Sequence, residues 1–412
     1  MRILHVNKFL YRRGGAEAYM LDVAELQRAA GHEVEFFAMR HPDNLPARFE
    51  DRFPSRVEFD PAPTTLSGKL RGAGRLLWST SAAQGIRAVL DRFRPDVVHL
   101  HNIYHQLSPS ILGPMRDAGV GVVMTLHDYK LACPTYRFLD HGEICEACVP
   151  RRFWSPTLRR CNAGSVAAST LNGLEATIHT FMGAYRPVHR FLCPSRFLEG
   201  KMRSSKVYPK RLRWLPNFVD AARVVPKTGE GGGVVFAGRL SHEKGVDLLI
   251  EAVRLHNGLV VDIAGEGPAR PELEQLAAER GVAARVRFHG RLGKDELHRL
   301  FAGAAVLAVP SRWYENMPLT VLEGFAAGLP VVASDLGGLP ELIEPAVDGL
   351  VVPPNDPAAL ADALSSLVGA PASAAAMGRA GRTKVLAKYG PGRHVEQLEG
   401  YYAEASDAGS AA

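Results

Sequence analysis

The stretch ENMPLTVLEGFAAGLPVVAS, residues 315–334, joins a helix-forming segment to a buried strand and indicates the type of fold. Asn316 and Pro318 are typical of a helix N-terminus, and Gly328 is typical of a helix end. The apolar run Val331–Ala333 that follows predicts a strand covered on both faces, as in a parallel sheet. A helix followed at once by such a strand predicts an α/β fold.

The same alternation of short apolar strands with helical stretches runs along the whole chain. In the first half, helices are expected to start near Ala16, Ala82, Ser108 and Val166. The expected strands are Ile3–Val6, Val34–Ala38, Val97–His101, Val120–Leu126, Arg190–Cys193, Val234–Ala237, Val260–Ala264, Val286–His289, Ala305–Val309, Val331–Ala333 and Leu350–Val352. This order predicts a doubly wound parallel sheet that is built twice.

The length of the chain also predicts two domains, because 412 residues exceed what one ordinary hydrophobic core organises. The boundary is expected at Leu215–Asp220 and the Pro/Gly-rich stretch 226–233. A last helix is expected at about Gly392–Ala405, followed by a disordered Ala/Gly/Ser tail. Ligands usually bind between two such domains.

Two carboxylates flank the helix start in the opening stretch. Glu315 precedes the helix and Glu323 lies inside it. Asn316 is expected to cap the helix, whose free N–H groups would face an anion such as a diphosphate, while both carboxylates can accept hydrogen bonds from sugar hydroxyls. The alternative is an ordinary capped amphipathic helix.

A second anion site is expected where the strand Val234–Ala237 ends. Gly238 breaks the strand into a loop that offers Arg239 and Lys244 before a helix at Val246. Two cations beside a glycine-containing turn suit a phosphate group.

These segments, together with Gly337–Glu341 and Asp348–Pro353, resemble in their order the donor half of a retaining glycosyltransferase of family four. The resemblance covers nearly the whole chain. It implies the GT-B fold, with two Rossmann-like domains facing across a cleft. It implies an acceptor-side domain at 1–215, a nucleotide-sugar domain at 216–388 and a segment at 389–405 that crosses back to the first domain.

The resemblance also implies an activity and the residues that carry it. A sugar would pass, with retention, from a nucleoside-diphosphate sugar to a saccharide or lipid-linked acceptor in cell-surface polysaccharide or glycolipid assembly. Glu315 would contact the sugar, Glu323 the ribose, and Arg239 and Lys244 the leaving diphosphate. No catalytic metal is expected, since the chain has no Asp-x-Asp triplet. The expected catalytic residues are His127, Arg239, Lys244 and Glu315, and the expected donor-binding residues are Gly14, Gly15, Gly238, Gly265, Arg291, Asn316, Met317, Pro318, Leu319 and Glu323.

Two features of the N-terminal half fit the same reading. Gly14 and Gly15 would let the backbone approach a ligand at a helix start, although a plain strand-to-helix turn is the alternative. The dinucleotide fingerprint Gly-x-Gly-x-x-Gly is absent there, which argues against a nicotinamide-dependent dehydrogenase. His127 follows an apolar strand and would face the ligand crevice, where similar enzymes contact the donor sugar. A buried core histidine is the alternative.

Histidines and cysteines suggest two metal sites. His99 and His101 share one face of a strand, a spacing that can bind a metal, but no carboxylate lies nearby in sequence. Within the insertion 133–161, a Cys-x-x-Cys knuckle and two more thiols could hold a structural Zn²⁺; reduced unlinked thiols or a redox pair are the alternatives. These residues are Cys133, Cys145, Cys148 and Cys161.

Charge is distributed unevenly along the chain. Residues 1–215 carry 31 Lys and Arg against 19 Asp and Glu, while residues 216–412 carry 18 against 24. A basic first half suits an anionic membrane or an anionic acceptor, and the segment from Lys69 to Trp78 could form an amphipathic contact. Nucleic acid is not expected, because there is no basic helix or aromatic-interleaved motif.

Localisation and function are predicted with alternatives. No apolar run approaches the 18 residues of a membrane span, and the N-terminus is strand-like, so we expect a cytoplasmic protein that can dock peripherally on the inner face of the membrane. A nucleotide-sugar epimerase of the same fold would interconvert sugars without an acceptor. A non-catalytic sugar-nucleotide-binding protein would bind the donor without reaction.

Overall fold

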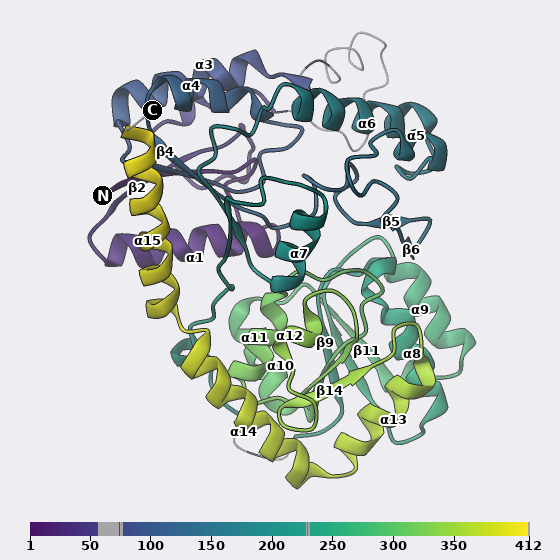
Figure 1. Ribbon diagram of the computed structural model, residues 1–412. Helices are drawn as coiled ribbons and strands as arrows, with labels where there is room; N and C mark the ends of the chain where they lie inside the picture. The colour runs from purple at the N-terminus through teal and green to yellow at the C-terminus, as the bar shows by residue number, and fades with distance from the viewer. Residues whose placement is uncertain (57–73, 75–76, 228, 230, 411–412) are drawn as a thin grey trace. The chain divides into compact units, whose positions relative to one another are not determined.

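The computed structural model describes the chain except residues 57–73, 75–76, 228, 230 and 411–412. The chain divides into two compact units (Figure 1). Unit 1 comprises Met1–Asp140, Glu146–Leu215 and Val395–Ala412, and unit 2 comprises His141–Cys145 and Pro216–His394.

Unit 1 is built on a six-stranded parallel sheet in the order β2-β1-β3-β4-β7-β8. Its strands are β1 (Arg2–Val6), β2 (Glu33–Phe37), β3 (Val97–Leu100), β4 (Gly121–Thr125), β7 (Arg190–Cys193) and β8 (Leu212–Trp214). Its helices are α1 (Gly15–Ala29), α3 (Thr80–Phe93), α4 (Leu112–Asp117), α5 (Ser155–Arg159), α6 (Val166–Phe181) and α7 (Arg196–Ser204). Short 3₁₀ turns η1 and η2 lie at Glu50–Arg52 and Pro109–Ile111, and the two-residue strand β5 is Leu139–Asp140. The equally short strand β6 (Glu143–Ile144) falls in the His141–Cys145 segment of unit 2.

Unit 2 contains a second six-stranded parallel sheet, in the order β11-β10-β9-β12-β13-β14. Its strands are β9 (Val234–Ala237), β10 (Val261–Ala264), β11 (Val286–Gly290), β12 (Val306–Val309), β13 (Val331–Ser334) and β14 (Gly349–Val352). Its helices are α8 (Val246–Leu255), α9 (Arg270–Glu279), α10 (Lys294–Gly303), α11 (Leu319–Ala326), α12 (Leu339–Leu342), α13 (Pro357–Val368) and α14 (Pro371–Lys388), with 3₁₀ turns η3 (Ala221–Arg223), η4 (His242–Lys244) and η5 (Ala283–Arg285).

Helices cover both faces of the unit 2 sheet, as Figure 1 shows for α8 and α11. Successive residues of one strand point to opposite faces, so Val306 and Ala308 pack into one hydrophobic core while Leu307 and Val309 pack into the other. Strands that are apolar at every position are needed for this arrangement, which is why the sequence shows short continuous apolar runs.

The expected strands and the two-sheet α/β architecture are confirmed, while the two-residue strands β5 and β6 and the edge strand β8 were missed. Strand β8 has only three residues and includes Arg213, so it shows no apolar run in the sequence. It pairs with β7 through Leu212 and Phe191 at the edge of the sheet. An edge strand can keep such polar residues because one of its sides faces no neighbouring strand.

Helix α15 spans Pro391–Ser410, which is longer than expected. Residues up to His394 belong to unit 2, and residues from Val395 onward belong to unit 1. The expected disordered tail is therefore wrong for residues 406–410. The helix backbone packs directly on β4, because a Cβ at Gly121 would lie 2.7 Å from the backbone of Ala405. This packing keeps residues 406–410 helical, although their composition alone predicts a disordered tail.

Two sequence expectations concern membranes. Among the residues that the structure describes, no single helix is long and apolar enough to cross a membrane, and only the sharply bent pair Pro357–Val368 and Pro371–Gly409 reaches that length and composition together. Most of the expected amphipathic segment, including Lys69, Arg71 and Arg75, lies outside the described residues.

Candidate active site

The strand order of the unit 2 sheet reverses between β9 and β12. In doubly wound sheets the loops at the carboxyl ends of two such strands diverge and leave a crevice for ligands. The loop after β9 carries Arg239 and Lys244, and the loop after β12 carries Glu315. The two anion-site segments of the sequence therefore meet at one edge of the sheet.

Lys244 and Glu315 form an ion pair across this crevice. The Lys244 ammonium donates to Glu315 Oε1 at 2.7 Å, and the Ser311 hydroxyl donates to the same oxygen at 2.6 Å. Glu315 is only 5% exposed, whereas the Lys244 side chain is partly open to solvent. The sequence reasoning missed Ser311, although a polar residue two positions beyond a buried strand was an available signal.

Glycines make this close approach possible. Gly245 has a φ of +68°, and a Cβ there would collide with the carbonyl oxygen of Pro310 in the neighbouring loop. On the other side, the N–H of Gly338 donates to the Glu315 carbonyl at 2.6 Å. The preceding Gly337 has a φ of +65°, and a Cβ there would collide with the same carbonyl oxygen. Side chains at Gly245 and Gly337 would push the loops apart, so backbone contact fixes the position of Glu315.

Glu315 is held in its ionised form. Burial opposes its ionisation, but the Lys244 ammonium and the hydrogen bonds from Lys244 and Ser311 outweigh that effect and lower the pKa of the carboxyl below its usual value. A fixed buried carboxylate beside an ammonium can accept hydrogen bonds from ligand hydroxyls and stabilise positive charge that develops on a ligand.

The expected helix cap at Asn316 is wrong. Helix α11 starts at Leu319, Pro318 occupies the N-cap position, and no side chain caps the helix. The preceding backbone is held extended by tertiary hydrogen bonds, since the Met317 carbonyl accepts from the Asn217 side chain at 2.8 Å. Helix N-terminal N–H groups therefore begin at Leu319, and Glu323 lies half-buried within α11.

The loops after β9, β10 and β11 are pressed together by further glycines. The N–H of Gly265 donates to the carbonyl of Gly290 at 2.7 Å, and a Cβ at Gly265 would collide with the carbonyl of Gly238. Gly265 has a φ of +142°, which favours glycine. Arg239 and Arg291, which directly follow Gly238 and Gly290 in the chain, are exposed. The expected residues Gly238, Gly265 and Arg291 thus share one edge of the sheet with Glu315.

In unit 1, the other expected residues also follow strand ends. Helix α1 begins at Gly15 with Gly14 as its N-cap, and no atom lies within 4 Å of a Cβ built at Gly15. His127 follows β4, is partly exposed, and contacts His101 with its Nε2 atom 3.0 Å from His101 Nδ1. Burial lowers the pKa of His127 to about 3, so its ring is neutral at pH 7.

The histidines of unit 1 lie closer together than the sequence indicated. Within the described part of the chain, His5, His99 and His101 are the one group of possible metal ligands whose ligand atoms all lie within 4.8 Å of one another. The four cysteines of the 133–161 insertion form no disulfide and no such group among the described residues. The structural zinc site stays a prediction.

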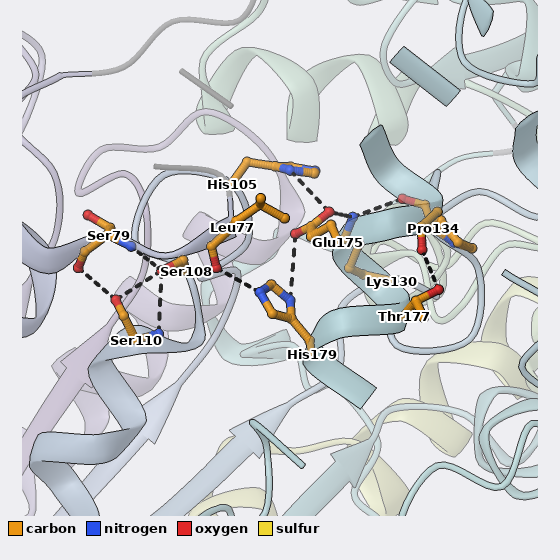
Figure 2. Close-up of polar contacts among 11 residues, drawn as sticks. Leu77, Ser79, His105, Ser108, Ser110, Lys130, Pro134, Glu175, Thr177 and His179 are labelled. Atoms are coloured by element: carbon orange, nitrogen blue, oxygen red, sulfur yellow. Dashed lines mark hydrogen bonds and ion pairs between the residues drawn. The ribbon is translucent and has the colours of Figure 1, made fainter. Parts of the chain in front are cut away.

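A buried charged cluster in unit 1 was not found from the sequence (Figure 2). The Lys130 ammonium donates to Glu175 Oε2 at 2.7 Å and to the Pro134 carbonyl at 2.9 Å. His105 and His179 lie on either side of this carboxylate, at 3.8 and 3.9 Å. Residues 45 positions apart gave no sequence signal for the pair.

This cluster borders a cavity of about 170 Å³. Aromatic and aliphatic side chains and two further arginines complete its lining. They include Leu131, Arg151, Phe153, Tyr185, Arg186 and Tyr208. A cavity with apolar walls and three cations against one carboxylate suits an anionic ligand that also has an apolar part.

Two family models match the chain and together span most of it. The model described as "Glycosyltransferase Family 4" matches residues 13–223, and the model described as "Glycosyl transferases group 1" matches residues 222–384. Their junction falls beside the boundary between the two units.

Curated relatives and solved structures resemble the chain as well. A GDP-mannose-dependent alpha-(1-6)-phosphatidylinositol monomannoside mannosyltransferase of Mycobacterium tuberculosis is 32% identical over 66% of this chain and 81% of its own length. An alpha-D-kanosaminyltransferase of Streptomyces kanamyceticus is 35% identical over 42% of this chain; the match spans less than half of that relative, 45% of its length.

The solved structures establish the fold. A sucrose-phosphate synthase of Thermosynechococcus elongatus superposes with a TM-score of 0.73 at 21% identity, covering 98% of this chain and 99% of that chain. The Anabaena HepE protein in complex with UDP and glucose superposes with a TM-score of 0.69 at 17% identity, covering 98% and 99%. The two six-stranded sheets are thus those of the GT-B fold.

Proposed function

The chain belongs to glycosyltransferase family 4, and on that premise we propose that it transfers a sugar from a nucleoside-diphosphate sugar to a saccharide or lipid-linked acceptor, with retention of anomeric configuration. The observation that carries the proposal is the Lys244–Glu315 pair at the strand-order reversal of unit 2. It puts a cation and a fixed carboxylate where this sheet type binds nucleotides.

The proposed mechanism follows from charge. Cleavage of the sugar–phosphate bond leaves negative charge on the diphosphate and positive charge on the sugar. An ammonium has three N–H donors, and Lys244 uses one on Glu315, which leaves two for diphosphate oxygens. Arg239 and the N–H groups from Leu319 onward add to this stabilisation, while Glu315 stabilises the sugar and Glu323 anchors the ribose. The acceptor attacks on the face that the diphosphate leaves.

Fixed cations in this proposal take the place that a divalent metal holds in other phosphate-transfer sites. The donor class is supported by two relatives, since HepE is described with UDP and glucose and the M. tuberculosis relative is named as GDP-mannose-dependent. Gly238, Gly265 and Arg291 would border the base and His127 the sugar. Backbone contacts of this kind suit any nucleoside diphosphate.

A thermal-shift series followed by an activity assay tests the function. UDP, GDP and their sugar conjugates are each titrated against the full chain, and one family is expected to raise the Tm, because a ligand at 100 times its Kd adds about 2.7 kcal/mol. Incubation with the binding sugar nucleotide should then release nucleoside diphosphate. Sugar interconversion without release would indicate an epimerase, and binding without any reaction would indicate a sensor; either result contradicts the proposal.

The acceptor is proposed to bind unit 1. The cavity beside Lys130, Arg151 and Arg186 offers positive charge together with apolar walls, as an anionic or lipid-linked saccharide needs. A place in surface polysaccharide or glycolipid assembly on the cytoplasmic side of the membrane follows from an acceptor of this class.

Peripheral docking on an anionic membrane is proposed for the surface formed by α5 and α6. Large apolar side chains are exposed there, with Phe181 90%, Leu158 77% and Trp154 62% exposed. Between residues 148 and 198 the sequence contains seven arginines and a single acidic residue, Glu175, which is buried against Lys130. Arg151, Arg152, Arg159 and Arg160 are exposed at or beside α5, and exposed apolar side chains near arginines complement anionic lipid headgroups.

Vesicle co-sedimentation tests the docking. The chain is expected to sediment with phosphatidylglycerol vesicles but not with phosphatidylcholine vesicles, and less so as salt rises, because charges are screened within about 10 Å at 0.1 M. A double replacement of Arg152 and Arg160 by alanine should weaken binding about 30-fold, because about 1 kcal/mol for each arginine adds up to about 2 kcal/mol. Arg379→Ala on α14 is the matched control. Equal binding to both vesicles, or none at low salt, contradicts membrane docking.

A further inference from the structure

A continuous line of hydrogen bonds runs through the interior of unit 1 to His127. Gln27 Oε1 lies 2.8 Å from His5 Nε2, His5 Nδ1 lies 3.0 Å from His101 Nε2, and His101 Nδ1 lies 3.0 Å from His127 Nε2. Gln27, His5 and His101 have no exposed surface. Gln27 belongs to α1, His5 to β1, and His101 directly follows β3. The line therefore runs from α1 past these two strands to the loop after β4, which carries His127.

The line must have one direction. A neutral imidazole carries one N–H donor and one lone-pair acceptor, so the proton position on one ring dictates that on the next. All three rings are neutral at pH 7, because burial lowers the pKa of His5 to about 4 and of His127 to about 3, and lowers that of His101 as well.

We propose that Gln27 sets the direction of this line, so that His5, His101 and His127 all carry their proton on Nε2 and His127 offers a bare Nδ1 lone pair to a ligand. Gln27 accepts from His5 through Oε1 because its Nε2 group is engaged as a donor to the Tyr402 hydroxyl at 3.0 Å. Each ring then donates from Nε2 and accepts at Nδ1, so the same proton position is repeated on the next ring.

A side branch of the network agrees with this direction. The Tyr402 hydroxyl accepts from Gln27, so its own proton is available to His99 Nδ1, 2.7 Å away. With Nδ1 as the acceptor, the neutral His99 ring carries its proton on Nε2, which lies 2.7 Å from the Thr125 hydroxyl and can donate to it. Tyr402 belongs to α15, so the C-terminal helix contributes to the orientation of Gln27.

The consequence concerns what His127 can bind, and it rests on the proposed role of His127 in contacting the donor sugar. A lone pair at Nδ1 accepts a hydrogen bond from a sugar hydroxyl but cannot donate one to a phosphate oxygen. Within the described residues Nδ1 has no protein partner, whereas Nε2 is engaged by His101. Gln27, His5 and His101 are positioning residues in this scheme, because none of them touches the ligand.

The same histidines do not require a metal ion. His5, His99 and His101 lie within ligand distance of one another, but each uses both ring nitrogens in hydrogen bonds to protein groups. A metal would have to replace several of these bonds at once.

Nitrogen NMR of the full chain tests the proton positions directly. In ¹⁵N-histidine-labelled protein at pH 7, with rings assigned by single histidine substitutions, His5, His101 and His127 should each show a protonated Nε2 and a bare Nδ1. A proton on Nδ1 of any of the three, a doubly protonated ring, or an equivalent of bound metal in gently purified protein overturns the proposal. The measurement needs no donor, so it stands even if the proposed transfer activity fails.

The variant Gln27→Met tests the role of Gln27. Methionine keeps the length of the side chain but removes the acceptor, so the three rings should populate both proton positions. Turnover is expected to fall about tenfold with a smaller rise in KM, since His127 then presents its Nδ1 lone pair to the sugar in only part of the molecules. Gln275→Met, the same exchange on the exposed face of α9, should change neither quantity. Unchanged proton positions in Gln27→Met would overturn the assignment of Gln27.

Discussion

Replacement of Lys244 by alanine is expected to lower the transfer rate by about 100-fold or more, which corresponds to about 2.7 kcal/mol of transition-state stabilisation. The Lys244 ammonium lies where the strand order of the unit 2 sheet reverses, and two of its N–H donors remain for the oxygens of the leaving diphosphate. Arg239→Ala is expected to have a loss of the same order. Steady-state kinetics on the purified variants measures both effects, and a loss below threefold would contradict the assigned role.

Lys244→Ala should also change the stability of the fold in a way that depends on pH. In the native protein the lowered pKa of Glu315 contributes stability that is present above about pH 4.5 and is lost as pH falls through the folded-state pKa. Without the ammonium, the pKa of the buried carboxyl is expected to rise instead. The stability difference should therefore be largest at pH 7 and shrink towards pH 4 in denaturant titrations.

Lys388→Ala on the exposed face of α14 serves as the control for Lys244→Ala. It removes an equal charge from unit 2 without touching the crevice, so neither the rate nor the pH dependence of stability should change. A stability difference for Lys244→Ala that is the same at both pH values would mean that Glu315 does not depend on this lysine.

Glu315→Gln is expected to lower turnover about 100-fold or more while donor affinity changes only a few-fold. Glutamine keeps the shape of the side chain and can still accept from Ser311, so the fold should be retained. It loses the negative charge that stabilises the sugar only when positive charge develops. Transfer kinetics and calorimetric donor binding on the same preparation separate the two effects.

Glu323→Ala provides the contrast, because Glu323 is assigned to the ribose and should affect nucleotide binding more than turnover. Glu272→Gln, at the exposed start of α9, repeats the chemical change of Glu315→Gln away from the crevice and should leave both constants unchanged. Equal and small effects of Glu315→Gln and Glu323→Ala on both constants would contradict the division of roles between them.

The sequence by itself determined the fold class, the positions of most strands along the chain and the chain segments that carry the Glu315 site. These features are local, since a run such as Val331–Ala333 must be covered on both faces and a glycine after a strand must turn the chain. Prediction from the sequence failed where hydrogen bonds between distant residues override the local preference for a helix cap. Asn316 does not cap α11, because Asn217 holds the backbone before the helix extended.

The tertiary structure alone decided which polar side chains meet. Lys244 and Glu315 are 71 positions apart, and they pair because β9 and β12 are neighbours in the sheet. Gln27 and Tyr402 are 375 positions apart, and they meet because the backbone of α15 packs on β4 at Gly121. Periodicity and capping act over a few residues, so a single sequence contains no signal for such pairs; only the packing of strands and helices brings them within hydrogen-bond distance.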